Sequence, residues 1–236
     1  MPTEPLFQSD AYLRDFDASV VASEGNSVAL DRTAFYPAGG GQPADAGTLT
    51  FEGETRRVEK LRRDGDLIWH DLDAAAPPVG TAVNGALDWD RRHGLMRTHT
   101  ALHILCGVVW RDYGAKVTGG NMQPLSARMD FEFENMSREL VREIEDKINI
   151  EVGAGRPISV RFLPRDAADK DPDLIRTKVN LLPAGITEVR VVDIEGLDIQ
   201  ADGGTHVATT AEVGRINVVG YKSKGRANKR IEIEIV

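Results

Sequence analysis

The sequence predicts an α+β protein, with a small β-barrel-like domain over residues 1–88 and an α+β domain with a mostly antiparallel sheet over residues 89–236. Two observations lead to this class. Short strand-like runs separated by turn residues fill the first part, which is typical of small barrels and sandwiches. Beyond residue 90, two long segments with helical periodicity are mixed with strand-like runs, which favours an α+β arrangement.

The strands expected in the first part are short. Residues 18–30 hold two alternating runs around Glu24-Gly25-Asn26, a hairpin signature. Further strands are expected at 48–51, 56–61, 67–71 and 83–89. Alanines and prolines at 74–78 indicate a loop inside this part of the chain.

Two helices are expected in the second part. Residues 91–113 carry apolar side chains at helical spacing and end at Gly114, a helix stop. A second helix is expected over 138–152, with Ser137 as its N-cap and Gly153 after its end. The strand-like runs around these helices lie at 126–133, 158–163, 189–194, 215–221 and 230–236.

Composition excludes several classes of protein. The chain is 41% hydrophobic and 28% charged, and no apolar run is long enough to cross a membrane. Acidic residues within the first twenty positions argue against a signal peptide, so we expect a cytoplasmic protein. The single cysteine, Cys106, excludes an internal disulfide framework and is expected in the core. A net charge of −8 argues against binding nucleic acid through bulk charge.

The sharpest local motif is the histidine pair His99 and His103. Histidines at i and i+4 of a helix lie one turn apart on the same face, so both imidazoles can reach one metal ion. Thr100 stands where a zincin protease has its catalytic glutamate, which makes a metalloprotease an unfavourable interpretation. The alternative is a pair of buried histidines bonded to backbone groups.

A second motif places Asp202 and His206 four residues apart, around Gly203-Gly204. The glycines favour a tight turn that could direct the carboxylate and the imidazole to a common point. The alternative is an ordinary glycine turn closed by the aspartate. Together with His99 and His103, these residues would form a four-ligand site suited to one zinc ion.

Two other segments are candidates for binding. Residues 39–42 (Gly39, Gly40, Gly41 and Gln42) form a glycine run that could bring backbone N–H groups close to a ligand. The run matches neither a Walker loop nor a dinucleotide fingerprint, and a flexible turn is the alternative. A basic stretch without acidic residues follows near the end of the chain: Arg215, Lys222, Lys224, Arg226, Lys229 and Arg230. Without other evidence, a solvated hairpin tip rich in lysine is the favoured alternative.

Four blocks together resemble the alanyl-tRNA editing proteins of the AlaX type, in particular the medium-sized class, and the editing domain of alanyl-tRNA synthetase. The blocks are FYPAGGGQPADAGTL at 35–49, MRTHTALHIL at 96–105, DIEGLDIQADGGTHV at 193–207 and GRINVVGYKSKGRANKRIEI at 214–233. Their order and separation also match, so the resemblance covers nearly the whole chain.

The resemblance implies that His99, His103 and His206 are metal ligands. The family pattern is Cys-Gly-Gly-Thr-His, and in this chain Asp202 stands at the position of the cysteine. An aspartate is an acceptable zinc ligand, although a harder one than a thiolate. We therefore expect the site to be retained.

The implied reaction is hydrolysis of the ester that joins a wrong amino acid, serine or glycine, to the tRNA for alanine. The glycine run resembles the segment that admits serine and rejects alanine, and Thr100 could contact the substrate hydroxyl. The basic stretch would contact acceptor-stem phosphates, with Arg91, Arg92 and Arg97 as the alternative footprint. Two other functions stay open: a metal-poor tRNA-binding module, and a hydrolase of other small aminoacyl esters.

Overall fold

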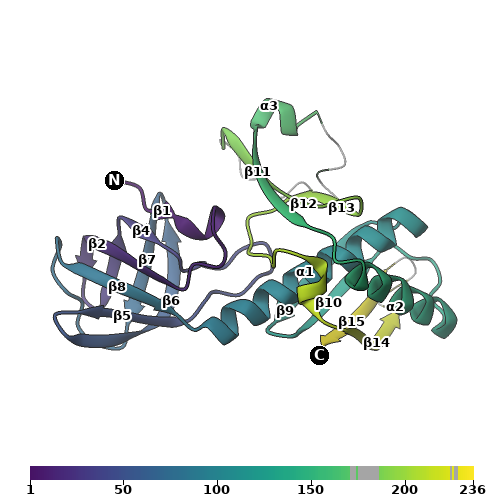
Figure 1. Cartoon of the computed structure of the whole chain (residues 1–236), viewed down its shortest axis with the longest axis horizontal. Helices are drawn as coiled ribbons and strands as arrows, with labels where there is room; N and C mark the ends of the chain where they lie inside the picture. Colours follow the sequence, from purple (N-terminus) through teal and green to yellow (C-terminus); the bar gives the residue numbers. More distant parts are fainter. Residues whose placement is uncertain (171–173, 175–185, 224, 226–227) are drawn as a thin grey trace. The chain divides into compact units, whose positions relative to one another are not determined.

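A computed structural model describes residues 1–170, 174, 186–223, 225 and 228–236 (Figure 1). The chain forms two compact units, Met1–Gly94 and Leu95–Val236. The division lies inside helix α1 (Trp89–Tyr113), a few residues beyond the domain boundary expected at 88. That the two units are separate domains stays a prediction. No helix among the described residues is long and apolar enough to cross a membrane.

The first unit is a closed antiparallel barrel of six strands in the order β2-β3-β7-β6-β5-β8. Alternate residues face inward, as in β2, where Phe16, Ala18 and Val20 are buried. The predicted hairpin is present, and Gly25 makes its turn with a φ of +62°. The strands are β2 (Asp15–Glu24), β3 (Ser27–Leu30), β5 (Gly47–Phe51), β6 (Glu54–Asp64), β7 (Leu67–Leu72) and β8 (Ala82–Leu87).

Three short elements complete this unit. Strands β1 (Glu4–Pro5) and β4 (Arg32–Thr33) pair in parallel, and η1 (Leu6–Gln8) is a single helical turn. The sequence pattern does not predict these elements, because two or three residues are too few to show a hydrophobic period.

Helix α1 begins earlier than the apolar pattern indicates. The expected strand at 83–89 ends at Leu87, because the Asp88 carboxylate accepts a hydrogen bond from Arg91 N (3.1 Å) and so caps the helix. The other end is as expected: Tyr113 is the last helical residue and Gly114 has a φ of +63°.

The described residues of the second unit form two antiparallel sheets. One has the order β14-β15-β10-β9 and the other β11-β12-β13. The strands are β9 (Val117–Gln123), β10 (Ser126–Phe131), β11 (Ile158–Pro164), β12 (Glu188–Ile194), β13 (Asp198–Ala201), β14 (Ile216–Ser223) and β15 (Lys229–Ile235). Two of these strands are not predicted by the sequence pattern: β9 contains Gly119 and Gly120, and β13 has only four residues.

Helix α2 (Arg138–Gly153) packs beside β14 of the larger sheet (Figure 1). The Ser137 hydroxyl accepts a hydrogen bond from Leu140 N (3.2 Å), which confirms the predicted N-cap. Asn149 ties the helix to the strand, since its side chain bonds both the N–H and the carbonyl of Ile216. Two short elements follow elsewhere in the unit, α3 (Arg165–Ala168) and η3 (Thr210–Val213).

Candidate metal centre

Helix α1 carries the histidine pair. His99 and His103 are 5% and 6% exposed, and their ring centroids lie 5.1 Å apart. Because the spacing is one helical turn, both side chains point from the same side of α1. Cys106, one turn further on, is buried and lies outside this cluster, as predicted for a core residue.

The turn after β13 carries the other two residues. Asp202 continues the pairing of β13 with β12, since its N–H bonds the Arg190 carbonyl at 3.1 Å. Its carboxylate accepts a hydrogen bond from Gly204 N (2.7 Å), which closes the predicted turn. The turn returns the chain so that His206 Nε2 lies 3.0 Å from Asp202 Oδ2.

These two segments converge. One ligand atom from each of His99, His103, Asp202 and His206 can be chosen so that all lie within 4.8 Å of one another. His99 Nε2 lies 3.6 Å from Asp202 Oδ1, and the rings of His99 and His206 stack with centroids 4.3 Å apart. Such a cluster is suited to holding one metal ion.

The pKa values of His99, His206 and Asp202 suit a metal site. Burial lowers the pKa of His99 to about 4, and burial with the charges of the cluster holds the pKa of His206 well below its ordinary value. Both imidazoles are therefore neutral at pH 7, as metal ligands must be. Burial by itself would raise the pKa of Asp202, but the neighbouring His99 and His206 lower it further than burial raises it. Its carboxylate is ionised.

His103 is held by a residue that the sequence analysis did not single out. Asp198 of β13 accepts a hydrogen bond from His103 Nδ1 at 3.1 Å, and its side chain is fully buried. Burial lowers the pKa of His103, but the bond to Asp198 outweighs this effect and raises it. With its proton on Nδ1, His103 directs Nε2 to the cluster. Gln200 bonds the same Asp198 oxygen at 2.6 Å.

Thr100 and Arg190 also contact residues of the cluster. Thr100 Oγ1 lies 3.1 Å from His206 Nδ1 and accepts a bond from Val207 N (3.3 Å), so it fixes the His206 ring. Arg190 donates to the Asp202 carbonyl at 2.9 Å and lies 3.8 Å from Asp202 Oδ2. Thr100 is fully buried, so its contacts support a positioning role. Its contact with substrate stays a prediction.

The donor set fits a metal of intermediate hardness. Three imidazole nitrogens and one carboxylate oxygen are ligand types that zinc accepts in a four-coordinate site. The hydrogen bonds on the far side of His103 and His206 are those usually found behind metal-bound histidines.

Comparison with known proteins decides the family. The alanyl-tRNA editing protein AlaX-M of Saccharolobus solfataricus is 40% identical over 235 residues, which cover 97% of each chain. The chain belongs to the AlaX-M alanyl-tRNA editing proteins. The AlaX-M protein of Methanosarcina mazei is 36% identical, with 99% of this chain and 97% of the relative covered. The resemblance inferred from the four sequence blocks is confirmed.

Other matches agree with this family. The family model described as tRNA synthetases class II (A) matches residues 10–91. The model described as threonyl and alanyl tRNA synthetase second additional domain matches residues 189–232, which contain Asp202 and His206. The alanine–tRNA ligase of Ignicoccus hospitalis is 38% identical over 98% of this chain, but the match covers only 26% of the ligase.

The glycine run of this AlaX-M family member is an ordered turn in the first unit. Ala38 to Gly41 all have positive φ, and Gly39 and Gln42 bond each other through backbone groups at 2.8 and 3.1 Å. Tyr36 donates its hydroxyl to the Gly39 carbonyl at 2.9 Å. Gln42 is buried at 2% exposure, whereas Gly39 to Gly41 are exposed. The turn therefore presents backbone to solvent.

Two buried charges fasten this turn to the start of α1 within the first unit. Asp45 accepts a hydrogen bond from Tyr36 N at 2.6 Å and pairs with Arg92 through both carboxylate oxygens. Arg92 is fully buried and also donates to the carbonyls of Ala34 and Ala11. Arg92 is therefore excluded from the alternative RNA footprint.

Several residues of the basic stretch already contact groups of the protein itself. Arg230 makes a two-pronged pair with Asp130 at 2.7 and 2.8 Å, and Lys229 is 6% exposed and donates to the Gly225 carbonyl. Lys222 is exposed but lies 2.7 Å from Glu232. Lys224 and Arg226 lie outside the described residues.

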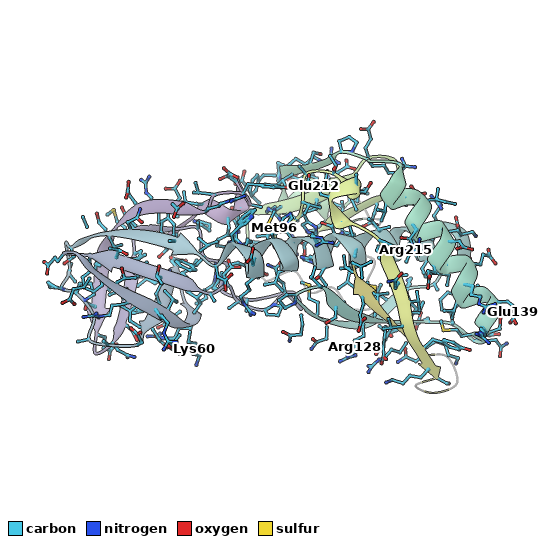
Figure 2. The ribbon with its side chains drawn as sticks, turned by 60° about the horizontal axis from the view of Figure 1, so that its bottom comes forward. Lys60, Met96, Arg128, Glu139, Glu212 and Arg215 are labelled. Carbon is cyan, nitrogen blue, oxygen red and sulfur yellow. The ribbon has the colours of Figure 1, made fainter. Side chains whose placement is uncertain are left out.

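Arg215 precedes β14, and its guanidinium lies 4.0 Å from Glu145 of α2. Figure 2 labels Arg215 and, in the first turn of α2, Glu139. Glu145 also lines a groove between β14 and α2. The groove adds two arginines that the sequence analysis did not consider, Arg138 and Arg142, which are exposed at i and i+4. Tyr221, 43% exposed, lines the same groove. The two arginines lie about 80 residues before the tyrosine in the chain. The sequence therefore did not predict that they line one groove.

Proposed function

We propose that this protein is a trans-acting deacylase that hydrolyses serine or glycine from the tRNA for alanine, with one zinc ion bound by His99, His103, Asp202 and His206. The observation that carries the proposal is the convergence of these four side chains within 4.8 Å, in a chain that matches AlaX-M proteins over nearly its full length. By the same likeness, we expect the protein to act in the cytoplasm.

The reaction adds water to the ester carbonyl, breaks the carbonyl bond to the ribose oxygen, and leaves a proton on that oxygen. A zinc ion in this cluster would supply a positive charge that holds the substrate amino group or activates the attacking water. The protein itself fixes the geometry: Asp198 orients His103, and Thr100 orients His206. A site held in this way needs little rearrangement when the substrate binds.

A hydroxyl-matched site would discriminate serine from alanine; glycine, which also lacks the hydroxyl, gains nothing from such a match. Polar groups that bond the serine hydroxyl are left unpaired when alanine binds, which costs binding free energy. We propose that the exposed glycine turn contributes such groups. Since the N–H groups of Gly39 and Gln42 are used inside the turn, the N–H groups of Gly40 and Gly41 are the ones we expect to meet the substrate.

Serine, glycine and alanine, each attached to the tRNA for alanine, provide the test. We expect rapid release of serine or glycine, slow release of alanine, loss of activity with a chelator, and recovery when zinc is added. An inert but tRNA-binding protein would establish the binding-module alternative. Equal hydrolysis of aminoacyl esters without tRNA would establish the general-esterase alternative. Metal analysis of the purified protein identifies the ion.

A further inference from the structure

The sheet of β11, β12 and β13 has two different faces. On one face, Leu163, Val189 and Val191 join a small core that includes Ala168 and Leu174, from the connection between β11 and β12. Because side chains alternate along a strand, the neighbouring residues of β11 and β12 belong to the other face. That second face is the one that carries the metal cluster.

The strand register defines a row of residues on this second face. Phe162 of β11 is paired with Arg190 of β12, and Arg190 in turn bonds Asp202 at the end of β13. Adjacent strands lie about 4.8 Å apart, so the backbone of Phe162 lies about 10 Å, two strand spacings, from that of Asp202. One strand alone separates the metal cluster from this aromatic residue.

The apolar side chains of this second face are buried on β12 but exposed on β11. Val192 and Ile194 are fully buried on β12, whereas Val160 and Phe162 on the edge strand β11 are 39% and 45% exposed. Proteins commonly protect edge strands with charges, whereas this face of β11 exposes an aromatic and a β-branched side chain next to each other. The apolar surface thus emerges beside the candidate site.

We propose that Phe162, flanked by Val160, is a stacking platform for the terminal nucleobase of the tRNA substrate. The inference rests on the proposed function, since the amino acid is esterified to the ribose of that same nucleotide. With the ester at the metal cluster, the attached base must lie about one sugar further away, a distance on the scale of the row from Asp202 to Phe162.

A nucleobase suits this surface better than a protein partner does. One aromatic ring and one valine are far too small for a protein interface, which buries about 800 Å² per partner. A base needs only one exposed ring, because every base has an apolar face that stacks on aromatic side chains.

The test combines a protein change with a substrate change. Seryl-tRNA with an intact terminal adenosine is compared with the same tRNA carrying an abasic terminal ribose, for the wild type, Phe162→Ala and Phe162→Tyr. We expect Phe162→Ala to lower kcat/KM about tenfold with intact tRNA, mainly through KM, and Phe162→Tyr to stay close to the wild type. With abasic tRNA the wild type should lose as much, and Phe162→Ala should lose nothing more.

Ile150→Ala removes another exposed apolar side chain, on α2 and outside the row, and should leave both substrates unaffected. Equal loss by Phe162→Ala on intact and abasic tRNA would mean a structural role and would overturn the platform. So would full wild-type activity on abasic tRNA, although the proposed deacylase function would then stand. Failure of the wild type on both substrates would instead overturn the deacylase function and the platform with it.

Discussion

The protein buries histidines in both of its units, and the two environments differ. In the barrel, His70 is fully buried, with Nε2 2.9 Å from the Thr33 hydroxyl and Nδ1 3.4 Å from the Val28 carbonyl. In the second unit, His99, His103 and His206 face one another and Asp202. Burial lowers the pKa of both His70 and His99 to about 4.

Burial and a lowered pKa therefore do not distinguish a metal ligand from a structural histidine. Both ring nitrogens of His70 are used by uncharged partners, which leaves no lone pair for an ion. His103 uses only Nδ1 for its protein partner and keeps Nε2 for the cluster. What marks the candidate site is the convergence of lone pairs, which depends on which nitrogen each partner occupies.

The largest contrast comes from removing one histidine of each kind. His103→Ala should lower deacylation more than about 100-fold, which exceeds the usual effect of altering a ligand's hydrogen-bond partner. His70→Gln should reduce the melting temperature but keep kcat near the wild-type value. Single-turnover deacylation and thermal unfolding of both variants measure these effects. A fully active, folded His103→Ala would contradict a metal-based mechanism.

The buried His70 should make the stability of the folded protein depend on pH. The unfolded chain protonates His70 near pH 6.5, whereas the folded barrel resists protonation until about pH 4. The folded state thus loses stability as the pH falls through this window, by about 3 kcal/mol at most for this residue. Urea unfolding from pH 7 to pH 4 should show a shallower pH dependence for His70→Gln. Parallel curves for the two proteins would contradict the shift.

Asp198→Asn should weaken the cluster without removing a ligand. The amide has nearly the shape of the carboxylate but no charge, and it can donate as well as accept, so it no longer fixes the His103 proton on Nδ1. We expect zinc affinity and activity to fall about 10- to 100-fold, by competitive titration and kinetics. Thr33→Val, the corresponding change beside His70, should leave zinc affinity unchanged. Wild-type affinity in Asp198→Asn would show that the bond has no role in ligation.

Substitutions of Asp202 test whether this residue binds zinc itself or only lies beside the residues that do. Asp202→Cys should preserve or tighten zinc binding, because a thiolate is a softer and stronger zinc ligand, and should make binding sensitive to oxidation. Asp202→Ala is the control and should weaken binding. Equal losses in the two variants, measured by competition with a chelator, would mean that position 202 is not a ligand.

The smallest effect is expected on the surface, where charges are screened. Neutralising Lys222, Lys224 and Arg226 together should make the slope of log tRNA affinity against log salt shallower by about 2 to 3 units if all three contact phosphates. Activity at saturating tRNA should change little. Arg230→Gln is the matched control, since Asp130 already neutralises Arg230. An unchanged slope would favour the groove that contains Arg138 and Arg142.

The local elements were predictable where one strong signal acts alone. The hairpin at Gly25, the end of α1 at Gly114 and the Ser137 cap depend on the conformational preferences of single residues. The start of α1 and the short strand β13 were missed, since a cap at Asp88 and a four-residue strand leave little pattern to detect. The six-stranded closure of the barrel is a property of pairing between distant strands.

The candidate site also has features that the local sequence predicts and features that only the tertiary structure shows. The sequence by itself determined the four candidate ligand types and their two four-residue spacings, because a helix and a glycine turn act over a few residues. Only the tertiary structure decided that the two segments meet, that Asp198 rather than solvent holds His103, and that Phe162 lies in the row of Asp202. Contacts between distant segments depend on packing and strand register, which a local pattern does not encode.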